Sequence, residues 1–196
     1  MKKIFFIIFA AVAIAGLFYY RAPGIRNYPS SGTDVVAFGD SLVVGVGSSK
    51  TGGFVSMLSE ELDVPIVNLG VSGDTTLGAL VRISELDKYE PKVVIVLLGG
   101  NDYLASVPPE ETFRNLSKIV DAIQARGSAV ILVGIGSNFD KEFENLAVNK
   151  KAAYVPDILE NIFENSKLMS DSLHPNDEGY KLMAERIKPI LEKLLK

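Results

Sequence analysis

A single histidine, His174, lies in the segment Asp171-Ser-Leu-His174-Pro near the end of the chain. A histidine can act as the general base for a serine nucleophile, and a nearby carboxylate can orient its ring and stabilise the imidazolium. Far upstream, Gly-Asp-Ser41-Leu follows an apolar run. These residue types predict an acyl-transfer site in which Ser41 attacks, His174 removes its proton and Asp171 orients His174.

Two further loops combine glycine with small polar residues, Ser-Gly73-Asp-Thr and Gly-Gly-Asn101-Asp. Ester hydrolysis needs donors for the oxyanion, and we expect them to be the backbone N–H groups of Ser41 and Gly73 and the side-chain amide of Asn101. Glycine and small polar residues also dominate ordinary turns, so each loop alone has a purely structural interpretation. Asp40 is a rival carboxylate to Asp171, but we expect it to form only local hydrogen bonds in its turn.

The elements that must position these loops are strands alternating with helices. Continuous β-branched runs predict strands that are covered on both faces. The expected strands are 34–38, 65–69, 92–98, 129–133 and a weaker one at 152–155. The expected helices are 53–62, 75–86, 109–126 and 177–195, the last capped by Asn176. This alternation predicts an α/β domain with a five-stranded parallel sheet and helices on both sides. Ligands of such sheets bind beyond the carboxyl ends of the strands, where the three polar loops lie.

Composition excludes several classes of function. The chain has 196 residues and a net charge of −4, and its Lys and Arg residues form no cluster beyond Lys2-Lys3, so we expect no nucleic-acid partner. It has no cysteine and one histidine, which excludes disulfides and thiolate chemistry and disfavours zinc. We expect no metal and no cofactor.

The N-terminus has a different composition. Residues 4–20 carry no charge and would span about 26 Å as a helix. We expect residues 1–20 to be a transmembrane anchor facing outward or a cleaved signal peptide, with the A-x-A-like site Ala13-Ile-Ala15; a buried core helix is the third alternative. Residues 21–33, rich in Pro, Gly and Ser, are expected to be a linker and residues 34–196 the catalytic domain. The protein would then be exported, and either held at the membrane by this segment or released.

The polar loops, taken together, resemble the four sequence blocks of the SGNH, or GDSL-type, esterase and lipase superfamily. The blocks are Gly-Asp-Ser41-Leu, Gly73, Asn101 and Asp171-x-x-His174, in the family's order over roughly residues 34–194. The chain looks most like the small bacterial members, acyl-thioesterase I, lysophospholipase L1 and arylesterase. The resemblance implies a three-layer α/β/α sandwich of flavodoxin-like type, Ser41 as nucleophile, an oxyanion hole from Ser41, Gly73 and Asn101, and no metal or cofactor. It implies small ester, thioester or lysophospholipid substrates.

One stretch departs from the family pattern. Residues 134–153 form a shorter stretch than expected, since relatives fit a loop and a full helix here. We expect a more open acyl site in consequence.

Two alternatives to a hydrolase remain. A nucleotide- or flavin-binding doubly wound domain is compatible with the fold, although Val44 and Ser49 break a P-loop pattern and Lys50 breaks a dinucleotide fingerprint. A non-catalytic protein of the same fold is the second.

Overall fold

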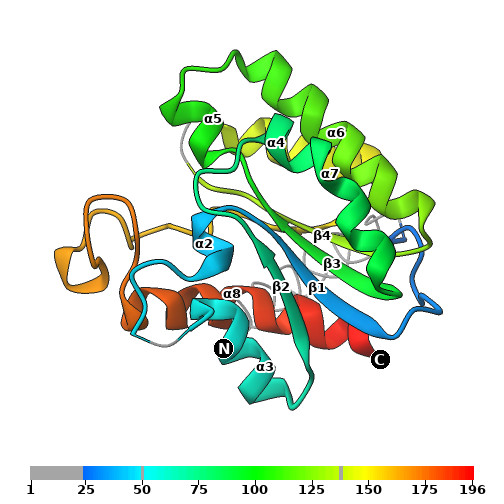
Figure 1. Cartoon of the computed structure of the whole chain (residues 1–196), viewed down its shortest axis with the longest axis horizontal. Helices are drawn as coiled ribbons and strands as arrows, with labels where there is room; N and C mark the ends of the chain where they lie inside the picture. The colour runs from blue at the N-terminus through cyan, green and yellow to red at the C-terminus, as the bar shows by residue number, and fades with distance from the viewer. Residues whose placement is uncertain (1–23, 50, 137–138) are drawn as a thin grey trace, which may run out of the picture.

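The computed structural model describes residues 24–49, 51–136 and 139–196 (Figure 1). The segment 1–20, expected to be an anchor or signal peptide, lies outside the described residues. Within the described ranges, no helix is long and apolar enough to cross a membrane.

The centre of the domain is a five-stranded parallel sheet, as the alternating pattern predicts. Its strands are β1 (Asp34–Gly39), β2 (Ile66–Gly70), β3 (Pro91–Leu97), β4 (Ala129–Val133) and β5 (Ala153–Val155). They lie in the order β2-β1-β3-β4-β5, with every pair parallel. The chain therefore reverses its direction of winding at β1 and β3, and a crevice for ligands forms at such a switch point.

Helices cover both faces of the sheet, which makes the fold a three-layer α/β/α sandwich (Figure 1). Helices α3 (Gly53–Leu62) and α8 (Asp177–Leu195) pack on one face, and α4 (Thr76–Val81), α6 (Pro109–Ala125) and α7 (Asp140–Lys150) pack on the other. Alternate residues of β1 supply both cores, with Val35 on the first face and Phe38 on the second. Each such fully buried side chain contributes roughly 1.5–3 kcal/mol relative to leaving it exposed.

The helices differ from the sequence prediction in several places. The helix expected over 75–86 ends at Val81 and is followed by a separate 3₁₀ segment, η1 (Ile83–Lys88). Two short helices, α2 (Ser41–Val44) and α5 (Gly100–Leu104), start inside the polar loops. Residues 166–168 form a further 3₁₀ turn, η3 (Ser166–Leu168).

The stretch 134–153, which we expected to be shorter than in relatives, contains a full helix that the sequence pattern did not predict. Helix α7 occupies 11 residues of it. Asp140 and Glu142 lie in its first turn, where acidic side chains interact favourably with the helix dipole. Phe143 and Ala147 are four residues apart and share the buried side, and this spacing fixes the helix against the sheet.

Residues 24–33, part of the expected linker, lie against the domain. The side-chain amide of Asn27 donates to the carbonyl oxygens of Gln124 at 2.7 Å and Ser128 at 3.0 Å. The Tyr28 hydroxyl donates to the carbonyl of Lys193 at 2.9 Å. This part of the chain is therefore held at the end of the sheet opposite to the polar loops.

Candidate active site

Ser41 stands where β1 turns into α2. Gly39 ends the strand, and a Cβ there would lie 2.2 Å from the carbonyl oxygen of Leu97, so only glycine lets the neighbouring strands approach this closely. Asp40 caps α2, and its carboxylate accepts the N–H of Leu42 at 3.0 Å. Ser41 is thus the first residue of a short helix at the carboxyl edge of the sheet.

His174 is brought to this edge by the loop that precedes α8. The backbone N–H of Ser170 donates to the carbonyl of His174 at 2.8 Å and closes the loop. Asn176, the expected N-cap of α8, accepts from Glu178 N at 3.1 Å and Gly179 N at 3.2 Å. The Tyr180 hydroxyl of α8 donates to the carbonyl of Val46 at 2.7 Å, which ties the helix to the loop after α2.

The three residues expected to form a triad are within hydrogen-bonding distance of one another. His174 Nε2 lies 3.1 Å from Ser41 Oγ, and His174 Nδ1 lies 2.9 Å from Asp171 Oδ2. The hydrogen bond from the His174 ring, followed by those from the N–H groups of Leu173 and His174, lowers the pKa of Asp171 to about 2. Asp171 therefore stays ionised across the neutral range, and the carboxylate is available to accept the Nδ1–H of the imidazole.

Asn101 lies in the loop after β3, at the start of α5. Its side-chain Nδ2 donates to the carbonyl of Asp74 at 2.9 Å and lies 3.3 Å from Asp40 Oδ2. Gly73 immediately precedes Asp74 and has a φ of 77°, a conformation that favours glycine. Among the described residues, no acceptor takes the N–H of Ser41 or Gly73, so both remain available to a ligand.

Asp40 forms the local turn hydrogen bond that we expected, and it also contacts Asn101. The residue is 3% exposed, and burial raises the pKa of its carboxyl to about 6 against the opposing effect of the Leu42 N–H. The charge of nearby Asp74 also raises the pKa of Asp40, and the charge of His174 lowers it, so the carboxyl of Asp40 interacts electrostatically with both residues. It does not contact the His174 ring; Asp171 does.

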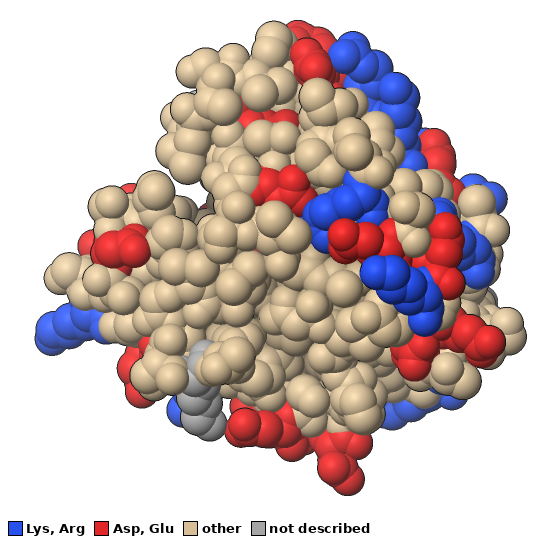
Figure 2. Space-filling model, viewed as in Figure 1, with Lys and Arg blue, Asp and Glu red and all other residues tan. Residues whose placement is uncertain are grey.

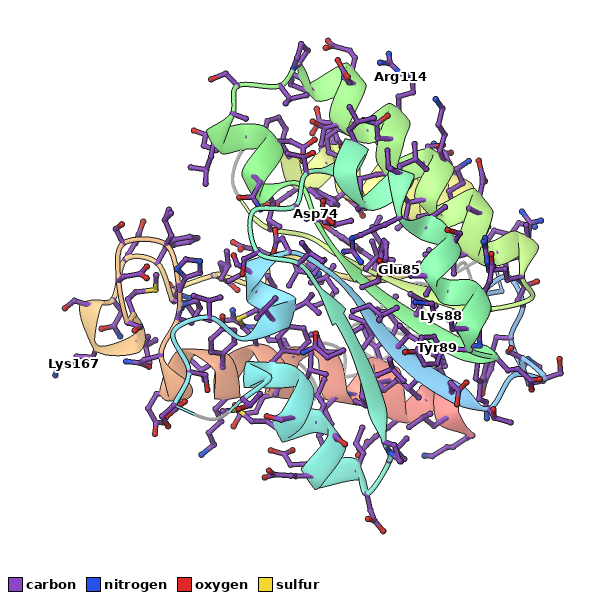
Figure 3. All side chains as sticks on the ribbon, viewed as in Figure 1. Asp74, Glu85, Lys88, Tyr89, Arg114 and Lys167 are labelled. Atoms are coloured by element: carbon purple, nitrogen blue, oxygen red, sulfur yellow. The ribbon has the colours of Figure 1, made fainter. Side chains whose placement is uncertain are left out.

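Two supports of the site were not anticipated from the sequence. Buried Asp102 accepts the N–H of Thr76 at 2.8 Å and also its hydroxyl at 2.5 Å, which joins α5 to the start of α4. Arg82 donates to Asp74 at 2.7 Å and to the carbonyl of Gly39 at 3.0 Å. Asp74, two residues before α4, is labelled in Figure 3. These contacts lock the loops after β1, β2 and β3 together.

A cavity of about 630 Å³ opens beside Ser41 and His174. One wall comes from α5 and the other from residues 157–164, and Figure 2 shows the surface hollowed between the corresponding lobes at the upper left and the left. Its apolar lining residues are Leu42, Tyr103, Leu104, Ile135, Leu159, Phe163 and Leu173. Asn101 also lines the cavity, whereas Gly73 does not. The site can therefore hold an apolar group next to a hydrogen-bonded serine.

The fold and the arrangement of these loops are those of an SGNH-type hydrolase, and the sequence comparison agrees. The GDSL-like Lipase/Acylhydrolase family matches residues 37–182, so the chain belongs to this family of enzymes. The match includes Ser41, Gly73, Asn101, Asp171 and His174.

Individual relatives carry esterase and thioesterase names. The chain is 30% identical over 178 residues to Esterase TesA of Pseudomonas aeruginosa and to Arylesterase of Vibrio mimicus, covering 82% of this chain and 89% of each relative. It is 27% identical over 175 residues to Thioesterase 1/protease 1/lysophospholipase L1 of Escherichia coli K12, covering 82% of this chain and 84% of that protein.

Solved structures give the same result. The crystal structure of TesA has a TM-score of 0.75 and 29% identity, over 82% of this chain and 99% of that one. The psychrotrophic esterase EstA from Pseudoalteromonas, inhibited by monoethylphosphonate, has a TM-score of 0.74 and 29% identity, over 83% and 98% of the two chains. The chain is thus an enzyme of the esterase and lipase type with the α/β fold of the SGNH hydrolases.

Proposed function

We propose that the protein hydrolyses carboxylic esters or thioesters through a covalent acyl-enzyme on Ser41. The observation that carries this proposal is the hydrogen-bonded run from Asp171 through His174 to Ser41, at the mouth of an apolar cavity. A nucleophile, a base and an orienting carboxylate in this order are what acyl transfer by serine requires.

In the first half of the reaction, His174 Nε2 removes the proton of Ser41 Oγ as the oxygen attacks the acyl carbon. The tetrahedral intermediate collapses when the imidazolium returns that proton to the departing alcohol or thiol. In the second half, His174 removes a proton from water, which attacks the acyl-enzyme, and the proton then returns to Ser41 as the acid leaves. The Asp171 carboxylate holds the ring with Nδ1 protonated throughout.

The charge that develops on the acyl oxygen would be held by the N–H groups of Ser41 and Gly73 and by the Asn101 amide. Asn101 is pre-oriented for this role, because one hydrogen of its amide is fixed by the carbonyl of Asp74. The second hydrogen makes a longer bond to Asp40 Oδ2, at 3.3 Å, and an oxyanion would take the place of that acceptor. Donors that are held in place before the reaction cost no reorganisation in the transition state.

The substrates we propose are small or lipid-like acyl compounds: simple esters, aryl esters, thioesters and lysophospholipids. The apolar lining of the cavity supports an acyl chain there, and the names of the relatives cover these same classes. No step of this mechanism calls for a metal or a cofactor. The described residues contain no group of His, Cys, Asp and Glu suited to a metal ion.

We also propose that the enzyme acts outside the cytoplasm, as an anchored or a released protein. The support is the uncharged run of residues 4–20 behind Lys2-Lys3. Residues 21–33 would connect this segment to a catalytic domain that spans 34–196. Fractionation of cells that express a C-terminally tagged chain, with alkaline washing of the membranes, separates the anchored form from the released one.

The test of the proposed activity is hydrolysis of p-nitrophenyl esters of increasing acyl length by the full-length protein and by Ser41→Ala. We expect turnover by the wild type and its loss in the variant, together with a length profile that reports the depth of the cavity. Covalent labelling by an alkyl fluorophosphonate, analysed by peptide mass spectrometry, should place the adduct on Ser41. Full activity in Ser41→Ala would overturn the proposed mechanism, and the absence of turnover and of labelling in the wild type would favour a non-catalytic role.

A further inference from the structure

The cavity beside Ser41 has a charge that its apolar lining does not explain. Four of the residues that line it carry carboxyl groups, and none is a lysine or an arginine. Besides Asp40 next to Ser41, these are Asp157, Glu160 and Glu164. The last three belong to the segment after β5 that forms the wall opposite α5. Glu160 and Glu164 are exposed, so both side chains face solvent.

Within the described residues, no cation forms an ion pair with the carboxylates of Asp157, Glu160 or Glu164. Arg186 of α8 donates to the carbonyl oxygens of Ile158 and Glu160, each at 2.6 Å, and so holds the backbone of the segment. Lys167, labelled in Figure 3, extends from the far end of the same lobe, away from α5.

Burial and the negative charges of this wall raise the pKa values of two neighbouring groups, Asp140 and Tyr154. Burial, followed by the charges of Asp157 and Glu160, raises the pKa of Asp140 at the start of α7. Burial and then the charges of Asp140, Glu144 and Asp157 raise the pKa of Tyr154 to about 12. The carboxylates of the wall therefore act together with those of α7 on groups behind the cavity.

From the three carboxylates without an ion pair in one wall of the substrate cavity, we infer that the enzyme selects neutral or cationic acyl substrates over anionic ones. This inference rests on the proposed function, since it concerns the same site. Charges of one sign in a cleft with otherwise apolar walls produce a focused electric field at its opening. This field changes the local concentration of charged substrates. Anionic thioesters and anionic lysolipids would be disfavoured, and neutral esters or esters with a quaternary ammonium group would be favoured.

The test compares substrates that differ only in charge, with the full-length protein at low salt. One series places the charge on the leaving group: butyrylthiocholine, its uncharged tert-butyl analogue, and S-butyryl mercaptopropionate. The other places it on the acyl group: the phenyl monoester of glutaric acid and its uncharged monoamide. The chain has no cysteine, so released thiol is measured without a background from the protein.

We expect kcat/KM for the anionic member of at least one series to be about tenfold below that of its neutral partner, a difference that shrinks at high salt. The double variant Glu160→Gln, Glu164→Gln should raise the anionic-to-neutral ratio severalfold. The double variant Asp63→Asn, Glu192→Gln changes net charge equally on surfaces remote from the cavity and should leave the ratio unchanged.

The inference is overturned if neutral and anionic substrates are cleaved equally in both series, or if the remote variant changes the ratio as much as the cavity variant does. If the enzyme cleaves neutral and charged esters equally well, the proposed function stands and only this inference is rejected. Failure to cleave any ester or thioester would reject the proposed function itself, and the inference with it.

Discussion

The carboxylate of Asp102 accepts both the backbone N–H and the hydroxyl of Thr76, and through this pair the loop that carries Asn101 is fixed to the loop that carries Gly73. Both residues are buried, with exposed fractions of 1% and 0%. The Thr76 hydroxyl oxygen in turn accepts from the Asn115 amide of α6 at 3.3 Å. Two of the proposed oxyanion donors therefore depend on one buried network that takes no part in the chemistry.

Asp102→Asn should weaken this network, because an amide replaces one accepting oxygen with a donor that faces Thr76. We expect the free energy of unfolding to fall by about 1–3 kcal/mol, the cost of leaving a buried polar group without its partner. Urea denaturation measures it, with Asp63→Asn on the surface as the matched control. A variant as stable as the wild type would show that the network does not contribute to folding.

Asn101→Ala should lower kcat much more than it changes KM, because its amide is proposed to act on charge that exists only in the transition state. The loss of one oxyanion donor costs about 2.7–4 kcal/mol, or roughly 10²–10³ in kcat. Steady-state kinetics with a p-nitrophenyl ester measures both constants. Asn145→Ala, on the exposed side of α7, is the control; a change in KM alone for Asn101→Ala would remove that residue from the oxyanion hole.

Asp171→Asn should be severe but less so than Ser41→Ala. The asparagine would present an N–H to His174 Nδ1 and so favour the ring tautomer that carries its proton on Nε2, where the base must accept. In a comparable triad, removal of the carboxylate costs about 10⁴-fold in kcat and removal of the serine about 10⁶-fold. The backbone bond from Ser170 to the His174 carbonyl still holds the main chain of His174 near Ser41 in the variant. Equal losses in the two variants would contradict this division of roles.

The sheet and the main helices could be predicted because their signals are local. Runs such as that of β3 contain buried β-branched residues on both faces, and no other element accommodates them. Helix α6 begins at a proline, has two acidic residues in its first turn and ends before Gly127, so its ends can be identified within a residue or two. The residues that we propose as the triad could be identified for a different reason, since a single histidine leaves one candidate for the base.

The parts that escaped prediction depend on contacts between distant residues. Nothing near Thr76 in the sequence indicates that Asp102 accepts its hydrogen bonds, because the two lie on different loops. Helices α2 and α5 are too short to show a periodic pattern. The packing of Asn27 against Gln124 has no pattern either, since irregular backbone is stabilised by individual hydrogen bonds.

The buried carboxyl of Asp40 should make stability depend on pH. Burial raises its pKa to about 6, above the ordinary value of 3.8, so between these values the native state binds more protons than the unfolded chain. Stability from this group therefore falls as the pH rises through that window. Asp40→Asn lacks the titration, so its unfolding free energy relative to wild type should rise by about 2 kcal/mol between about pH 4.5 and about pH 7.5. Urea denaturation at the two pH values measures this, and a constant difference would contradict it.

Asn27→Gly should destabilise the catalytic domain, although Asn27 precedes the first strand. The side chain of Asn27 bridges the end of α6 and the residue before β4, and its φ of 60° suits glycine equally well, so the substitution removes the hydrogen bonds without straining the backbone. The loss of two hydrogen bonds is worth about 1–3 kcal/mol, and each kcal/mol lowers Tm by about 2–4 °C in a domain of this size. Asn161→Gly is the control, since that residue is exposed and has a φ of 58°. If thermal unfolding of the two variants coincides, residues 24–33 are a linker; if Asn27→Gly alone unfolds earlier, they belong to the folded domain.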